Sequence, residues 1–195
     1  GGAAPPGLQE LCPTAWRGNR PAEENGLIIL GAPVGASAFV EAHAQSRLQE
    51  ELQLLEHLPH LPDLQCAWDL LLYCVVPRAN HLLRTLPPSQ SRAYAAAHDE
   101  ALLATLSRLL GRRESEYLSP ASTPGRVAAL PHRLGGAGLR SAVRTAPGAY
   151  WAAWADALPM IRARTPYWGA TFLEALDTAA GGRAACLQEA TRAAA

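Results

Sequence analysis

Residues 130–141 read LPHRLGGAGLRS, and this stretch organises the rest of the chain. It contains three glycines within four positions: Gly135, Gly136 and Gly138. Because glycine has no Cβ, these positions permit backbone turns that other residues avoid. Directly downstream, Tyr150, Trp151 and Trp154 recur at helical spacing. The pattern predicts a fixed structural turn that places an aromatic helix, with Trp151 as its buried anchor, against the body of the fold.

The length and composition favour one globular domain. The chain has 195 residues, of which 49% are hydrophobic, so it can bury one sizeable core. We predict an all-α fold, a single-domain irregular helical bundle of about six to eight helices with at most one short N-terminal strand. Residues 1–25 are expected to form an irregular lead-in or linker, residues 26–166 the helical domain, and residues 167–195 the C-terminal helices.

Apolar periodicity predicts the individual helices. Ser37 is expected to cap a helix that has one apolar stripe. The acidic residues of this helix, Glu51 among them, lie off the stripe and are expected on a solvated face. The apolar members of that stripe are Val40, Ala44, Leu48, Leu52 and Leu55. Asp63 is expected to cap a nearly all-apolar core helix over residues 64–76. A long helix is expected from Ser89 to about residue 110, with Gly111 just beyond its end.

Prolines and glycines predict the remaining boundaries. After the glycine turn we expect a short helix over residues 139–145 and then a separate aromatic helix after Pro147, kinked or divided at Pro159. Residues 167–179 form the next predicted helix, stopped at residues 181–182, and residues 183–192 a last one. Residues 26–30 are the only predicted strand, whose partner is expected outside this chain.

Cysteine usage and hydropathy indicate the compartment. The four cysteines show no CxxC pair, so we expect core thiols in a reducing environment, and an intracellular location in the cytoplasm or nucleus. They are Cys12, Cys66, Cys74 and Cys186. The longest apolar run, residues 70–76, is far shorter than a bilayer crossing, so no membrane partner is expected. Because the chain begins at Gly1 without methionine, we expect a piece of a longer protein.

Charge is unevenly distributed in a chain whose formal net charge is zero. Residues 37–70 contain six acids and one arginine, whereas residues 126–164 contain six arginines and one aspartate. The two segments are read either as solvated faces that attract each other or as an acidic face and a basic binding surface. A net charge of zero disfavours an indiscriminate nucleic-acid binder.

Catalytic and metal-binding patterns are weak throughout. The five aspartates include no adjacent pair that would hold two divalent cations, so no catalytic residues are predicted. His57, His60 and Cys66 lack a fourth ligand at zinc-site spacing, so no metal site is predicted. Asp99 is read as a solvated residue. Residues 135–138 lack the lysine and hydroxyl of a phosphate-binding loop, which favours a structural turn.

Three arginines around the glycine turn form the candidate binding site: Arg133, Arg140 and Arg144. Arg140 and Arg144 are four positions apart, so they share a face if both lie on one helix, and both could reach neighbouring backbone phosphates. The alternative is ordinary exposed arginine or a set of partners for the acidic helix.

The order of several segments resembles a known family. The chain first has an entry segment, LGAPVG at 30–35, and then an apolar segment that ends at Pro77-Arg78. A long helix, RLGGAGL at 133–139 and Tyr150-Trp151 follow in that order. This order over residues 27–165 resembles the region downstream of the polymerase palm in LINE-type, non-LTR retrotransposon reverse transcriptases. The resemblance implies a thumb-like domain after a palm that would supply the catalytic aspartates and the Mg²⁺ ions. No cofactor is expected in this chain itself.

The resemblance implies a function. The chain would be a non-catalytic segment of an RNA-directed DNA polymerase that grips the primer–template duplex, with nucleic acid and an upstream palm domain as its partners. A helical protein-interaction module, or a decayed remnant with no nucleic-acid role, is the alternative from a different class.

Overall fold

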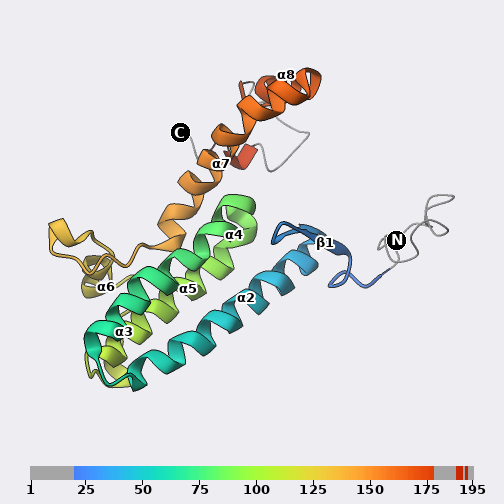
Figure 1. Cartoon of the computed structure of the whole chain (residues 1–195). Coiled ribbons are helices and arrows are strands. Elements are labelled where there is room, and N and C mark those ends of the chain that lie inside the picture. The colour runs from blue at the N-terminus through green and yellow to red at the C-terminus, as the bar shows by residue number, and fades with distance from the viewer. Residues whose placement is uncertain (1–19, 178–187, 191, 193–195) are drawn as a thin grey trace. The chain divides into compact units, whose positions relative to one another are not determined.

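The computed structural model describes residues 20–177, 188–190 and 192 (Figure 1). Its contacts divide the chain into two compact units, with the boundary between Arg47 and Leu48 inside one long helix. Expectations for residues 1–19, for the stop at residues 181–182 and for most of the last predicted helix lie outside the described residues.

The first unit contains a two-stranded hairpin. β1 (Gly26–Ile29) pairs antiparallel with β2 (Ala32–Gly35), and Leu30 and Gly31 between them both have positive φ, 51° and 82°. Such a turn matches the twist of a tight hairpin. The pairing corrects the expectation that residues 26–30 form the only strand. Pro33 hid the partner strand, because proline is tolerated only where a strand edge needs no N–H donor.

α2 (Ser37–His57) follows the hairpin and crosses the boundary between the units. Four residues of its predicted apolar stripe are buried, as expected, but so is Glu51, which was assigned to the solvated face. The buried stripe residues are Val40, Ala44, Leu48 and Leu55. The helix ends before Pro59, where a short 3-10 turn, η1 (Leu58–His60), continues the chain.

A continuous but irregular helical run begins at the predicted cap. The Asp63 side chain accepts hydrogen bonds from the backbone N–H groups of Gln65 and Cys66, which confirms it as the cap of α3 (Leu64–Leu70). A π-helical turn, η2 (Leu71–Val75), a 3-10 turn, η3 (Val76–Ala79), and α4 (Asn80–Thr85) follow. Pro77 supplies no N–H, and the change of hydrogen-bond pattern just before it absorbs that loss.

This run exposes one side, contrary to the expected all-apolar core helix. Ala67, Leu71 and Val75 lie four residues apart and are buried, so they form its inner face. Cys66 and Cys74 fall off that face and are exposed, which corrects their assignment as core thiols. Cys12 and Cys186 lie outside the described residues.

Long helices form the rest of the second unit. α5 (Pro88–Leu109) has Leu110 as its C-cap, and Gly111 adopts the predicted left-handed conformation, with φ 68°. A 3-10 turn, η4 (Glu114–Glu116), and α6 (Thr123–Ala128) lead to the glycine turn, which contains η5 (His132–Leu134). At the C-terminal end, Glu189 accepts hydrogen bonds from the backbone N–H and hydroxyl of Ser89 at the start of α5.

α7 (Ala142–Arg164) is one helix where two were expected, and α8 (Pro166–Asp177) follows it. Pro147 and Pro159 both lie inside α7 without dividing it. Each proline removes one backbone hydrogen bond, whereas α7 contacts both α4 and α5, and these contacts support the helix. Because α7 starts at Ala142, the predicted helix over residues 139–145 is wrong in its first three positions.

The core of the second unit lies where α5 packs against the end of α2, η1, the irregular run, and the segment from α6 to Leu139. It is built mainly from leucine and valine side chains of these segments: Leu55, Leu58, Leu71, Val75, Val76, Leu102, Leu103, Leu106, Ala128 and Leu139. Seven α-helices and the one hairpin in the described residues confirm the all-α class. No helix in this part of the chain combines the length and apolar character needed to cross a bilayer.

Candidate functional site

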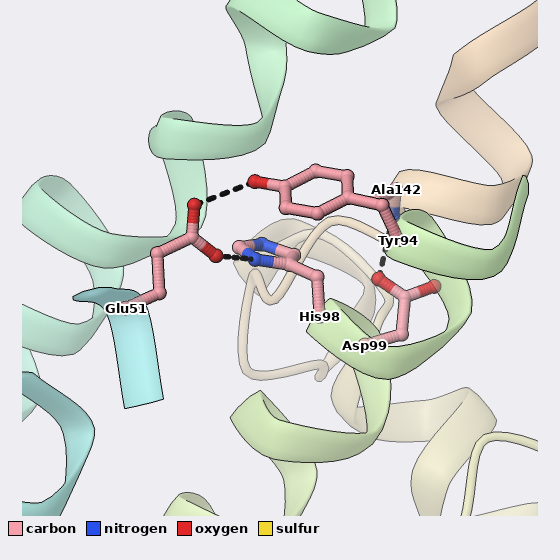
Figure 2. A network of polar contacts seen from close by, with 5 residues as sticks. All are labelled: Glu51, Tyr94, His98, Asp99 and Ala142. Atoms are coloured by element: carbon pink, nitrogen blue, oxygen red, sulfur yellow. Dashed lines mark hydrogen bonds and ion pairs between the residues drawn. The ribbon is translucent and has the colours of Figure 1, made fainter. Parts of the chain in front are cut away.

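Asp99 ties the start of α7 to α5. Its Oδ1 accepts from the backbone N–H of Ala142 at 2.6 Å (Figure 2). Its Oδ2 accepts from the Ser141 hydroxyl at 2.7 Å and the Val143 N–H at 3.2 Å. Asp99 is only 5% exposed, so the expectation of a solvated residue is wrong. Free N–H groups at a helix start attract a carboxylate, and a neighbouring helix supplies this one.

A second buried carboxylate, on α2, contacts the α5 residue that precedes Asp99. Glu51 on α2 accepts from the Tyr94 hydroxyl at 2.5 Å and lies 2.8 Å from Nδ1 of His98, both on α5 (Figure 2). The Tyr94 and His98 rings stack with centroids 6.0 Å apart. Nε2 of His98 has no hydrogen-bond partner within the described residues.

The position of this second network indicates a structural role. His98 is 1% exposed and lines none of the four cavities described in the second unit, so the surrounding protein encloses its ring. Two hydrogen bonds satisfy the buried Glu51 carboxylate, which would otherwise be costly to bury. The network therefore fixes α2 against α5, as Asp99 fixes α7.

Three arginines surround a small cavity beside Asp99. The cavity has a volume of about 60 Å³, room for a few water molecules, and its lining includes Arg126 of α6, Arg140 and Arg144. We call it the cationic cavity. None of the three guanidinium groups has an ion pair or hydrogen bond to another described residue. Asp99 also lines this cavity, but its carboxylate bonds to the start of α7 and forms no ion pair with the three arginines.

The predicted site residues are only partly brought together. Arg140 precedes α7, so it does not share a helical face with Arg144, yet both line the cationic cavity. Arg133 is exposed on η5 and lies outside that lining. Arg126 was missed, although it belongs to the same basic segment. Arg126 lies on the short helix α6, and the local sequence does not indicate that the glycine turn folds back beside this helix.

The glycine turn produces this fold-back. Its backbone returns to the end of α6, where Gly138 N–H donates to the Leu130 carbonyl at 2.8 Å and Leu139 N–H to the Ala128 carbonyl at 3.2 Å. Gly135 and Gly138 have φ values of 76° and 73°, and a Cβ on Gly136 would lie 2.1 Å from the Leu130 carbonyl oxygen. All three positions therefore require glycine, and together they set Arg140 opposite Arg126.

The other candidate chemistries gain no geometric support. Ser141 donates its hydroxyl to Asp99 and has no histidine partner in the described residues, so it is not arranged as a nucleophile. Asp156, the one acid of the basic segment, pairs with Arg84 at 2.7 Å. No group of three His, Cys, Asp or Glu side chains in the described part of the chain is placed to hold a metal ion.

Comparison with known proteins identifies no relative: no protein-family model, no curated protein and no solved structure matches this chain.

Proposed function

We propose that this chain is a non-catalytic segment that grips a nucleic-acid backbone through the cationic cavity. The observation behind the proposal is that Arg126, Arg140 and Arg144 line one cavity and have no ion pair with any described residue. They come from two segments joined by the glycine turn. The order of motifs shared with the post-palm region of LINE-type reverse transcriptases supports the same role, a grip on the primer–template duplex.

Arginine chemistry favours a phosphate at this place. The guanidinium group offers a planar fork of donors that fits two phosphate oxygens, and it stays charged at all working pH values. Arginines used for stability would be paired with carboxylates, as Arg84 is with Asp156. Those around the cationic cavity have no such partner among the described residues. The hydrogen bond from Ala142 to Asp99 fixes the start of α7, which carries Arg144 and directly follows Arg140 and Ser141.

The test is a fluorescence-anisotropy titration of the whole chain with a labelled duplex, DNA–DNA or RNA–DNA, at several salt concentrations. If about three phosphates are neutralised, the logarithm of the binding constant should fall against the logarithm of salt with a slope near −3. Arg126→Ala, Arg140→Ala and Arg144→Ala should each weaken binding and flatten that slope by about one.

Two further variants make the titration specific. Arg92→Ala removes an exposed arginine of α5 that does not line the cationic cavity, so it should keep the parent slope. Arg133→Ala shows whether the contact extends along η5. Equal slopes for the parent and the three cavity variants, or no binding at low salt, would contradict the proposal.

A protein-interaction module is the second candidate, favoured by the hairpin. Leu27, Ile29 and Val34 share one hairpin face in the strand register, and each is about half exposed, at 48%, 54% and 56%. Exposed apolar faces of this kind mark sites of protein contact. A palm domain in a longer protein is the partner that the family resemblance implies. If the chain is an interaction module, it should associate in a concentration-dependent way in sedimentation, and Ile29→Glu should abolish that association. Neither the parent nor any variant should then bind nucleic acid.

A further inference from the structure

A second, larger cavity adjoins the cationic one. Its volume is about 350 Å³, within the range of small-molecule sites, and it lies between the irregular helical run and the glycine turn. Tyr73 and Asn80 line it from the first side, His132 and Gly138 from the second, and Arg140 at its edge. We call it the aromatic cavity.

The two rings that line this cavity differ in their packing: the His132 ring packs against a neighbour, whereas the Tyr73 ring is exposed. His132 lies against Trp68, edge to face with centroids 6.4 Å apart. A Cβ on Gly138 would lie 2.8 Å from Nε2 of His132, so the glycine makes room for the imidazole. Tyr73, in contrast, is 70% exposed, and its hydroxyl has no hydrogen bond to a described residue. A large ring left this open has a face available for a ligand.

Arg140 connects the two cavities. It lines both of them, as does Ala129 beside it. A ligand that spans both cavities would contact three guanidinium groups in the cationic cavity. In the aromatic cavity it would contact the Tyr73 ring, the His132 imidazole and the Asn80 amide, which offers both donors and acceptors. This order matches the parts of a nucleotide, a phosphate attached through a sugar to a flat base.

We propose that the aromatic cavity receives one unpaired nucleobase, so that the site takes a single-stranded end beside a duplex rather than a continuous duplex. The inference rests on the proposed function, since Arg126, Arg140 and Arg144 would hold the adjoining phosphates. A base inside a duplex is stacked on both faces and cannot enter a cavity, whereas an unpaired base stacks readily on aromatic side chains. Stacking accepts every base, so little sequence preference is expected.

The experiment compares three labelled probes on the whole chain at one low salt concentration. The first is a blunt DNA duplex, the second carries a short single-stranded extension, and the third carries the same extension with abasic residues. The extended duplex should bind more tightly than the other two, which should bind alike. Base–aromatic stacking predicts that Tyr73→Ala weakens binding of the extended duplex by about 5- to 150-fold and leaves the other two nearly unchanged.

Matched variants separate stacking from other effects. Tyr73→Phe keeps the ring and should retain the preference for the extension. Tyr167→Ala removes a tyrosine of α8 that is exposed to a similar degree, 76%, and does not line the aromatic cavity, so it should change nothing. Because Tyr73 is exposed, its replacement should leave the thermal unfolding temperature near that of the parent.

The outcomes distinguish this inference from the proposed function. Binding that depends on the three arginines but treats all probes alike overturns only the base-binding inference. Absence of binding to every probe overturns both. A nucleoside monophosphate that competes as strongly as the extended duplex also overturns the inference, because the cavity would then accept a free nucleotide without a strand.

Discussion

Asp99 is the residue on which the position of α7 depends. It accepts three hydrogen bonds from the start of α7 while it lies buried on α5. Local sequence assigned it to solvent, because an aspartate beside a glutamate in a helix is ordinarily exposed. The groups that donate to Asp99 lie 42 and 43 positions along the chain, so the local sequence could not reveal them.

Replacing Asp99 with alanine should lower the free energy of unfolding by about 2–3 kcal/mol, because charged hydrogen bonds are lost and buried donors stay unsatisfied. Asp69→Ala is the control, since Asp69 is exposed and, among the described residues, bonds only to Gln65, so its effect should stay within about 0.5 kcal/mol. Urea unfolding followed by circular dichroism measures both. Similar midpoints for the two variants would show that the cap adds little.

Cys66 and Asp63 form a second local pair. The Cys66 thiol donates to Oδ2 of Asp63 at 3.4 Å. This hydrogen bond, followed by the carboxylate charge, raises the pKa of Cys66. The backbone N–H of Gln65 and then the thiol lower the pKa of Asp63. The reactive thiolate of Cys66 therefore forms at a higher pH than in an ordinary cysteine.

Asp63→Asn should move the pH midpoint of Cys66 alkylation to lower pH. Asparagine keeps the helix cap but removes the negative charge, so the thiolate becomes easier to form. The measurement is the rate of iodoacetamide labelling against pH, read for each peptide by mass spectrometry. Cys74 is exposed on the same helical run and serves as the internal reference. An unchanged midpoint for Cys66 would show that the carboxylate does not control the thiol.

At the scale of elements, the aromatic helix packs through a different ring from the expected one. Tyr150 is buried at 4% exposure, whereas Trp151 is only half-buried, which corrects its assignment as the anchor. Trp154 contacts Tyr150 edge to face, with centroids 6.5 Å apart. Adjacent helical residues point about 100° apart, so only one of a neighbouring pair can face the core directly. Spacing located the aromatic cluster but could not choose its inner member.

Tyr150→Ala should therefore destabilise the chain by about 3–5 kcal/mol, the range for a large buried aromatic side chain. Trp151→Ala should cost only about 1–2 kcal/mol, because less apolar surface leaves water at that position. Urea unfolding should be followed by circular dichroism, since the second variant also removes a fluorophore. A larger loss for Trp151→Ala would mean that the helix turns its other side to the core.

Two helix ends could be predicted because residues close in sequence determine them. The cap at Asp63 and the left-handed Gly111 depend on residues within one turn, and both occur as expected. Prolines misled the prediction inside α7. Pro147 and Pro159 each remove a backbone hydrogen bond, but packing against α4 and α5 outweighs that loss. Whether a proline ends a helix thus depends on contacts that periodicity does not contain.

At the scale of the molecule, folding and not net charge decides which arginines of the basic segment line one cavity. The chain is neutral, yet the glycine turn brings Arg126 next to Arg140 and Arg144. Arg133, although central in the sequence motif, projects outside the same cavity lining. The titrations above therefore test a surface assembled by tertiary structure.

The sequence by itself determined the all-α class, the apolar stripe of α2, the cap of α3, the end of α5 and the requirement for glycine at residues 135, 136 and 138. These features depend on hydrogen bonds and side-chain periodicity within a few residues, so local patterns contain them. Only the tertiary structure decided which polar groups are buried, because burying Glu51 and Asp99 requires donors from distant segments. It also decided the members of the cationic and aromatic cavities, since cavity walls come from residues separated along the chain and joined only by packing.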